Sequence, residues 1–138
     1  MAARTLTLRV VSPEGVVVET EAEAVTVPSE AGSFGVLPRH APLVALTDSG
    51  LLKASGGEGG DREYLIHDGF VEVLDDTVTI LTRAAELPTE IDLERAARAA
   101  ERARERLRKG GLRDLDYARA QAALRRALAR ERMARRHA

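Results

Sequence analysis

The chain has 138 residues, a formal net charge of -1, 44% hydrophobic residues and no cysteine. This length suits one domain, or one domain with a helical appendage. The composition excludes a disulfide scaffold and a cysteine metal site. No stretch approaches the roughly 20 apolar residues that a bilayer span needs, so we expect no membrane-spanning segment.

The small net charge hides an asymmetry between the two parts of the chain. Residues 1–89 hold 6 Lys and Arg against 14 Asp and Glu, a net charge of -8. Residues 90–138 hold 15 against 8, a net charge of +7. The sequence therefore predicts two modules with different surfaces, with domains at 1–88 and 89–138.

The first module has the pattern of short β-strands. Leu6, Leu8 and Val10 alternate with polar residues, which is the period of a half-buried strand. Frequent turn residues separate the strands, as in a sandwich or barrel. The glycine-rich stretch 55–61 is predicted to be a hairpin tip, because it lacks the Gly-Lys-Ser/Thr of a phosphate-binding loop and opens no helix. Strands are expected at 4–11, 16–19, 24–29, 50–55, 63–73 and 76–82.

After Pro88 the pattern becomes helical. We expect Thr89 or Glu90 to cap a first helix, in which alanines at 3/4 spacing form a narrow apolar stripe that ends at Gly110-Gly111. A second helix begins near Asp114 or Asp116, with a stripe of Tyr117, Ala120, Leu124, Ala127 and Leu128. The two helices are predicted to form an antiparallel hairpin, which is held weakly because alanine buries little area.

The arginines of this hairpin allow three interpretations. Their spacing places two groups on helix faces that converge if the hairpin closes, namely Asp92, Arg95 and Arg102, and Arg119, Arg126 and Arg130. The first interpretation is a pocket for a nucleotide, in which guanidiniums bind phosphate oxygens. The second is a solvated surface of i,i+4 ion pairs. The third is a nucleic-acid surface, which is disfavoured because Tyr117 is the one aromatic residue of the helices.

Several motifs, in order along the chain, resemble the epsilon subunit of the F-type ATP synthase. "VVSPEG" resembles the opening strand and turn of that family, and "GSFGVLPRHAPLV" at 32–44 resembles its most recognisable loop. "YLIHDGFVEV" at 64–73 and "VTILTRAAE" at 78–86 resemble its later strands, and "LDYARAQAALRRALAR" at 115–130 its second helix. The likeness covers nearly the whole chain.

The resemblance implies an α+β fold, an N-terminal antiparallel β-sandwich followed by a C-terminal antiparallel two-helix hairpin. It implies a non-catalytic rotor subunit that couples the gamma subunit to the c-subunit ring of a proton-translocating synthase. It also implies a hairpin that inhibits ATP hydrolysis when it extends toward the alpha and beta subunits. The location implied is the cytoplasmic face of the bacterial membrane, which the chain reaches only through the complex.

The resemblance further implies a site for ATP as a regulatory ligand, with no cofactor required. The family motif I/L-D-x-x-R-A matches Ile91, Asp92, Arg95 and Ala96. The other positions that match this pocket are Glu86, Arg102, Arg126 and Arg130. Replacement of Arg95 by alanine is expected to abolish ATP binding.

Contact with the c ring or the gamma subunit is implied for the loop residues Ser33, Phe34 and His40. The family often carries an acid where Ser33 stands, which puts a polar contact there in doubt, and an alternative for His40 is that it only orders its own loop. His67-Asp68 replaces small residues of the family, and a catalytic pair is disfavoured because no nucleophile is expected beside it. We predict no catalytic residue and no metal site, since the spacing of His40, His67 and His137 is unlike that of metal ligands.

Two other functions stay open at this point. A stand-alone ATP-sensing binding protein would use the same hairpin, and a nucleic-acid binder would use the basic half. Neither gives a role to the motifs of the sandwich. We therefore predict the rotor subunit, with no nucleic-acid partner.

Overall fold

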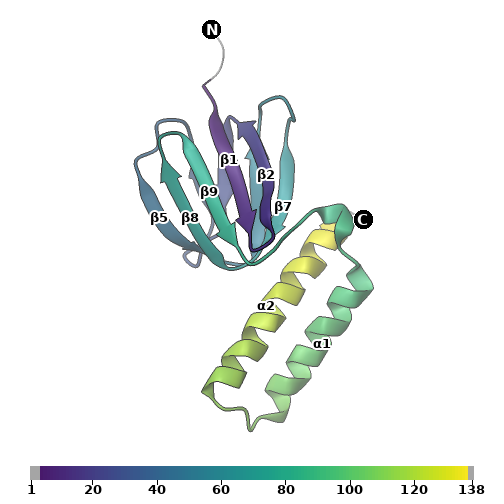
Figure 1. The fold of residues 1–138 in the computed structure, drawn as a ribbon. Coiled ribbons are helices and arrows are strands. Elements are labelled where there is room, and N and C mark those ends of the chain that lie inside the picture. Colours follow the sequence, from purple (N-terminus) through teal and green to yellow (C-terminus); the bar gives the residue numbers. More distant parts are fainter. Residues whose placement is uncertain (1–3, 137–138) are drawn as a thin grey trace. The chain divides into compact units, whose positions relative to one another are not determined.

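The computed structural model describes residues 4–136, so His137 lies outside the described residues. The chain divides into two compact units, Met1–Leu87 and Pro88–Ala138. The first is a sandwich of two five-stranded β-sheets and the second is a pair of helices (Figure 1). The predicted fold class is confirmed.

One sheet, here called sheet A, has the strand order β2-β1-β9-β8-β5. Its first strand lies near the centre, antiparallel to β2 on one side and parallel to β9 on the other. The sheet is therefore not antiparallel throughout, which is a refinement of the predicted fold. Its strands are β1 (Leu6–Ser12), β2 (Gly15–Ala22), β5 (Leu43–Thr47), β8 (Gly69–Leu74) and β9 (Thr77–Thr82).

The other sheet, sheet B, has the order β10-β7-β6-β3-β4 and is antiparallel. The glycine-rich stretch 55–61 joins two of its strands, β6 and β7, as the sequence predicts. The single segment expected at 63–73 is instead two strands that belong to different sheets. The strands of sheet B are β3 (Ala24–Val27), β4 (Phe34–Val36), β6 (Gly50–Ser55), β7 (Arg62–Ile66) and β10 (Ala85–Glu86).

The core of the sandwich consists of the inward positions of both sheets. Leu6, Leu8 and Val10 of β1 are each at most 1% exposed, which confirms the alternation read from the sequence. On β9 the inward residues are Val78, Ile80 and Thr82. Because successive side chains of a strand point to opposite faces, the residues between them form the outer face of sheet A.

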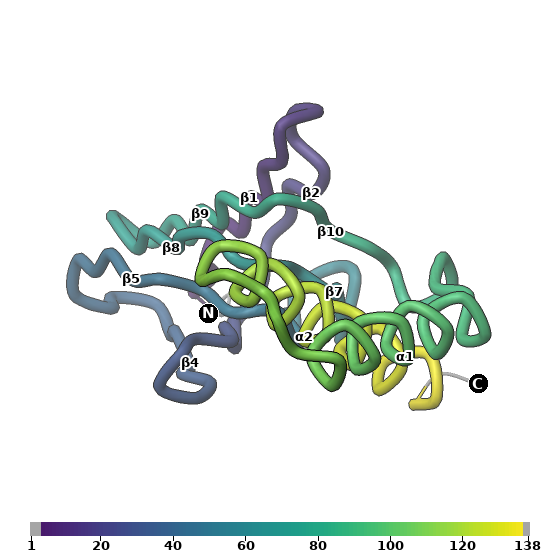
Figure 2. The backbone as a smooth tube through the Cα atoms, turned by 90° about the horizontal axis from the view of Figure 1, so that it is seen from below, coloured from purple at the N-terminus to yellow at the C-terminus, as the bar shows by residue number. Residues whose placement is uncertain are grey.

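The second unit begins with a 3-10 turn, η1 (Pro88–Glu90), and continues into α1 (Leu93–Lys109) and α2 (Asp114–Arg136). The two helices lie side by side (Figure 2), joined by a short segment after Gly110, whose φ of 70° ends α1 as predicted. Small residues line the seam between the helices, with Ala96, Ala100, Ala103, Ala120 and Ala127 buried.

Two details of the hairpin differ from the sequence-based expectation. The N-cap of α1 is Asp92, not Thr89 or Glu90, because those two residues are taken up by the 3-10 turn. The side-chain oxygen of Asp92 accepts a hydrogen bond from the backbone N–H of Arg95 at 3.2 Å. Tyr117 is 46% exposed and lies outside the buried stripe, which continues toward Met133 and Ala134 at the other end of α2.

Candidate functional site

The outer face of sheet A carries an apolar row that crosses all five strands. Leu46 pairs with Phe70, Phe70 with Leu81, Leu81 with Val11, and Val11 with Val16. Paired residues point to the same face of a sheet, so the five side chains form one continuous line, here called the apolar row. Phe70 is 52% exposed and Leu81 49%, and Leu46 and Val16 have similar values.

The neighbouring line on the same face is mostly polar. Glu72 pairs with Thr79, Thr79 with Arg9, and Arg9 with Glu19, whose carboxylate lies 3.7 Å from the Arg9 guanidinium. The contrast concentrates the exposed apolar surface at one end of the sheet, although Val44, opposite Glu72, and Leu74 are also exposed on this face. An apolar patch bounded by polar residues is typical of a protein interaction site.

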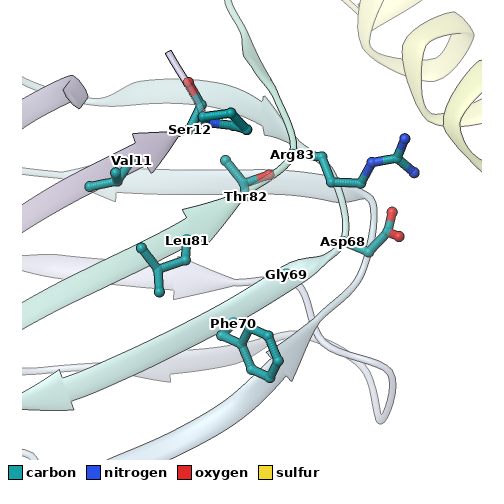
Figure 3. Close-up of a pocket in the computed structure, with 9 residues that line it drawn as sticks. Val11, Ser12, Asp68, Gly69, Phe70, Leu81, Thr82 and Arg83 are labelled. Atoms are coloured by element: carbon teal, nitrogen blue, oxygen red, sulfur yellow. The ribbon is translucent and has the colours of Figure 1, made fainter. Parts of the chain in front are cut away.

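A shallow groove of about 470 Å³ lies at this end of sheet A and includes part of the apolar row. In Figure 3 the side chains of Val11, Leu81 and Phe70 lie along three neighbouring strands at the groove. Gly69 forms part of its wall, and a Cβ atom at this position would lie 1.8 Å from the carbonyl oxygen of Leu81. The close approach of β8 to β9 here therefore requires glycine. The lining residues are Val11, Ser12, Pro13, Asp68, Gly69, Phe70, Leu81, Thr82 and Arg83.

The three predicted loop contacts occupy different environments. Ser33 is exposed, whereas Phe34 opens β4 and packs against the core of the sandwich. His40 is half-buried, and its Nδ1 lies 2.6 Å from the carbonyl oxygen of Ala41. The histidine thus orders its own loop, while exposed Leu37 and Val44 flank it. The predicted contact role of these residues stays a prediction.

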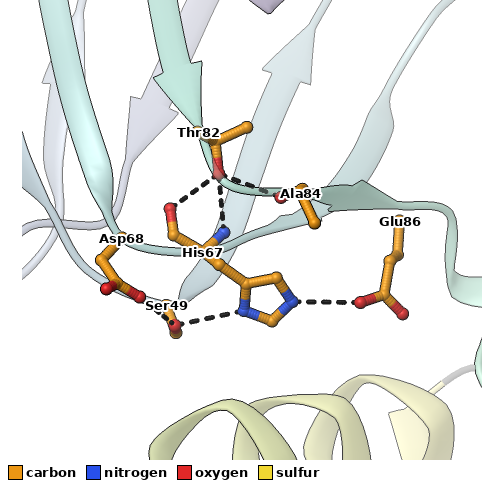
Figure 4. A network of polar contacts seen from close by, with 6 residues as sticks. All are labelled: Ser49, His67, Asp68, Thr82, Ala84 and Glu86. Atoms are coloured by element: carbon orange, nitrogen blue, oxygen red, sulfur yellow. Dashed lines mark hydrogen bonds and ion pairs between the residues drawn. The ribbon is translucent and has the colours of Figure 1, made fainter. Parts of the chain in front are cut away.

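His67 is the centre of a polar network inside the sandwich unit (Figure 4). Its ring is 1% exposed, with Nδ1 3.2 Å from the hydroxyl of Ser49 and Nε2 3.0 Å from the carboxylate of Glu86. The hydroxyl of Thr82 accepts from the backbone N–H of His67 at 3.0 Å and lies 2.8 Å from its carbonyl oxygen. The network therefore links the segment just after β7 to β9 and β10 around one buried imidazole.

The expectation that no nucleophile lies beside His67 is wrong, since Ser49 comes within hydrogen-bond distance from a remote turn. The serine hydroxyl also approaches Asp68 at 3.4 Å. In a Ser-His-Asp site the serine contacts Nε2 and the acid contacts Nδ1, and here the two nitrogens are exchanged. The imidazole is buried and neither Ser49 nor His67 lines the groove, and the contacts of the network join strands of the sandwich.

The arginines of the hairpin differ in whether they form ion pairs within their own helix. Arg98, Arg104, Arg108 and Arg119 each pair with an acidic residue of their own helix at 3.2–3.9 Å. For these residues the solvated-surface interpretation holds, and this includes Arg119, which the spacing predicts on the converging face. Within residues 4–136, Arg95 and Arg102 make no ion pair, which leaves both guanidiniums available to an anion.

The antiparallel arrangement brings part of the predicted ATP site to one level of the hairpin. Arg95 lies 14 residues from the end of α1, about 21 Å along the axis at 1.5 Å per residue. Arg126 and Arg130 lie 12 and 16 residues into α2, at about 18 and 24 Å. Arg102, at about 10 Å from the end of α1, lies closer to the connecting loop.

The remaining predicted ligands have structural partners already. Asp92 caps α1, Ala96 is buried in the seam between the helices, and Ile91 is half-buried just before the cap. Glu86 belongs to the sandwich unit, where it contacts His67. Nothing in the structure tests these residues as ATP ligands.

Sequence reasoning missed the apolar row. Part of the signal was present, because Leu81 lies between Ile80 and Thr82 of the strand predicted at 76–82 and so points to the face opposite to theirs. Also, no group of three or more histidine and acidic residues with the geometry of a metal site occurs among the described residues. Neither helix of this part of the chain is long and apolar enough to cross a bilayer.

Two family models match the chain in succession. The β-sandwich domain of the ATP synthase delta/epsilon chain matches residues 5–88, and the long α-helix domain of the same chain matches residues 89–135. Together they cover nearly all described residues of both units.

Individual relatives agree with the family models. The ATP synthase epsilon chain of Halalkalibacterium halodurans is 46% identical over 123 residues, which covers 89% of this chain and 92% of the relative. That of Desulfitobacterium hafniense is 46% identical over 130 residues, with 93% and 95% covered.

Two solved structures have a similar fold. A chain of the Euglena gracilis mitochondrial ATP synthase, solved with its c-ring, superposes with a TM-score of 0.80 at 26% identity, covering 96% of this chain and 82% of that one. A chain of the Tetrahymena thermophila central stalk and c-ring gives 0.61 at 15% identity, covering 99% and 98%, and shows the fold alone. From the family models and the bacterial relatives together, this chain belongs to the ATP synthase delta/epsilon chain family, as a homologue of the bacterial epsilon subunits.

Proposed function

We propose that this chain is the non-catalytic rotor subunit that joins the gamma subunit to the c-subunit ring of a proton-translocating F-type ATP synthase. Its place would be the cytoplasmic face of a bacterial membrane, held there through the complex. The observation that carries this proposal is the apolar row on sheet A, considered together with the family of the chain.

The apolar row suits a permanent partner better than solvent. Each of its four most exposed side chains leaves about half of its surface in water. Covering half of a Leu or Phe side chain contributes about 1 kcal/mol, so the row as a whole favours association by several kcal/mol. The gamma subunit is the proposed occupant, and the 37–44 loop with His40 is the proposed contact to the c ring.

Direct titration of this chain with the purified gamma subunit of the same organism tests the rotor assignment. We expect a one-to-one complex that resists salt, because the proposed contact is mainly apolar. Failure to bind gamma, combined with retained ATP binding, would instead favour a stand-alone ATP-sensing protein.

A second proposal concerns the hairpin, which would act as a brake controlled by ATP. In the closed hairpin Arg95, Arg126 and Arg130 lie at similar heights along the two helix axes, and guanidiniums that converge there would suit phosphate oxygens. A ligand that binds only the closed form stabilises it by mass action. When ATP falls, the hairpin would extend toward the alpha and beta subunits and inhibit ATP hydrolysis.

The alanine seam between the helices supports a hairpin that opens at low cost. Alanine side chains remove little apolar area from water when the helices pack, so the helix–helix contact contributes little free energy. The many arginines of the open helices would then meet acidic surfaces of the alpha and beta subunits. The chain would need no cofactor for either state.

We expect Arg95→Ala to weaken ATP binding by about tenfold or more, since a hydrogen bond to a charged group contributes about 1.5–3 kcal/mol. The measurement is calorimetric titration of the isolated chain with ATP. Arg98→Ala is the matched control, because Arg98 lies one turn away on α1, is exposed and pairs with Glu94. Equal affinities for the two variants would contradict the assignment of Arg95.

A further inference from the structure

Two turns distant in sequence carry non-glycine residues in the left-handed region of backbone space. In the turn Leu37–His40, the backbone N–H of His40 donates to the carbonyl oxygen of Leu37 at 3.2 Å, and Arg39 has a φ of 70°. Proline followed by a residue with positive φ defines a type II turn, in which glycine or asparagine is the favoured third residue. An arginine there is disfavoured unless something else fixes the turn.

The second turn joins β8 to β9. Leu74 pairs with Thr77, which leaves Asp75 and Asp76 as a two-residue loop with φ values of 49° and 58°. Positive φ values at both loop residues match a type I′ hairpin turn, for which Asp-Gly is a preferred sequence. Asp76 therefore stands where glycine would be accommodated more easily.

One hydrogen bond connects these two disfavoured residues. The backbone N–H of Arg39 donates to Oδ1 of Asp76 at 2.6 Å, across 37 positions of sequence. The other carboxylate oxygen lies 3.4 Å from Nε of Arg4, and the backbone carbonyl of Asp76 accepts from the N–H of Thr7 at 2.9 Å. A charged acceptor makes the bond to Arg39 stronger than a bond between neutral groups.

We propose that Asp76 is a positioning residue that fixes the Leu37–His40 turn for contact with the c ring. This inference rests on the proposed function, because it assigns a device to the loop that the proposal uses. The turn sets the direction of two side chains, that of Leu37, which is 62% exposed, and that of His40, which is half-buried. Without the carboxylate, Arg39 leaves the left-handed region and these groups lose their fixed arrangement.

The test replaces Asp76 by glycine and measures rebinding to the ATP synthase complex stripped of its own epsilon subunit. Glycine suits the type I′ turn, which offsets part of the free energy lost with the hydrogen bond to Arg39, so the thermal midpoint of the isolated chain is expected to fall by a few degrees at most. The affinity for the complex is expected to fall about tenfold, as for the loss of a charged hydrogen bond. A large loss of affinity together with a small change in the thermal midpoint is not expected of a residue that only stabilises the fold.

Three further variants separate the proposed role from its alternatives. Asp76→Asn keeps an acceptor oxygen and tolerates positive φ, so its affinity should stay within about twofold of the unchanged chain. Arg39→Gly in the Asp76→Gly background creates Pro-Gly, which forms the type II turn unaided, and should restore binding. Asp75 lies in the same turn but makes no bond to Arg39. Asp75→Ala should therefore lower the thermal midpoint and have little effect on the affinity for the complex.

Each outcome leads to a definite conclusion. If the unchanged chain does not rebind, the proposed function itself fails. If it rebinds and Asp76→Gly binds equally well, or if Arg39→Gly does not restore the double variant, the positioning role of Asp76 is overturned.

Discussion

Leu81→Glu is expected to weaken binding to the gamma subunit by about a hundredfold or more. The change places a carboxylate at the centre of the apolar row, where a partner would cover it without a counter-charge. An unpaired charge removed from water costs several kcal/mol, and about 2.7 kcal/mol corresponds to a hundredfold. Because Leu81 is 49% exposed in the isolated chain, the fold itself should tolerate glutamate.

The matched control for this prediction is Thr79→Glu. Thr79 lies on the same face of the same strand, but in the polar line beside Arg9 and Glu72. Titration of both variants with gamma, together with their thermal midpoints, separates loss of the contact from loss of the fold. Equal effects of the two substitutions would show that added charge, and not the apolar row, determines the affinity.

Gly69→Ala is expected to destabilise the sandwich by about 3 kcal/mol or more, the upper range for forcing an atom into a packed site. The new Cβ would meet the carbonyl oxygen of Leu81 at 1.8 Å, and a backbone atom cannot move aside as a flexible side chain can. For a unit of this size the melting temperature should fall by more than about 10 °C. Thermal unfolding followed by circular dichroism gives the measurement.

Gly35→Ala is the corresponding control, since a Cβ at Gly35 meets nothing within 4 Å and its φ is compatible with alanine. Its melting temperature should stay within a few degrees of that of the unchanged chain. A similar loss of stability in both variants would mean that replacing a glycine in either strand destabilises the sandwich whatever its surroundings. The contact with Leu81 would then not be the cause.

Local pattern was enough to predict much of the fold. The alternation in β1 identified that strand and its inward face, the strand at 76–82 was predicted as well, and the change of pattern after Pro88 located the hairpin. The parallel pairing of β1 with β9 was out of reach, because nothing in either strand specifies a partner about 70 residues away. For the same reason the apolar row could not be assembled, since its five members come from five strands whose order depends on long-range pairing.

The N-cap of α1 shows a different limit of prediction from sequence. Thr89 and Asp92 are both favoured N-cap residues, so residue type alone did not distinguish them. The 3-10 turn at Pro88–Glu90 moved the start of α1 to Leu93 and made Asp92 the cap. This gives the aspartate of the Ile91–Ala96 motif a structural role beside the ligand role predicted for it, so Asp92 substitutions would mix loss of helix with loss of binding.

The parallel pair at the centre of sheet A has a consequence for synthesis of the chain on the ribosome. The first strand made can pair with β2 at once, but it must wait for residues 77–82 before its other edge is covered. Until then the free edge of β1, a strand rich in Leu and Val, can form backbone hydrogen bonds with another chain. Such long-range pairing also slows folding. The nascent sandwich should therefore depend on protection by chaperones until β9 emerges, and fragments that end before this strand should aggregate.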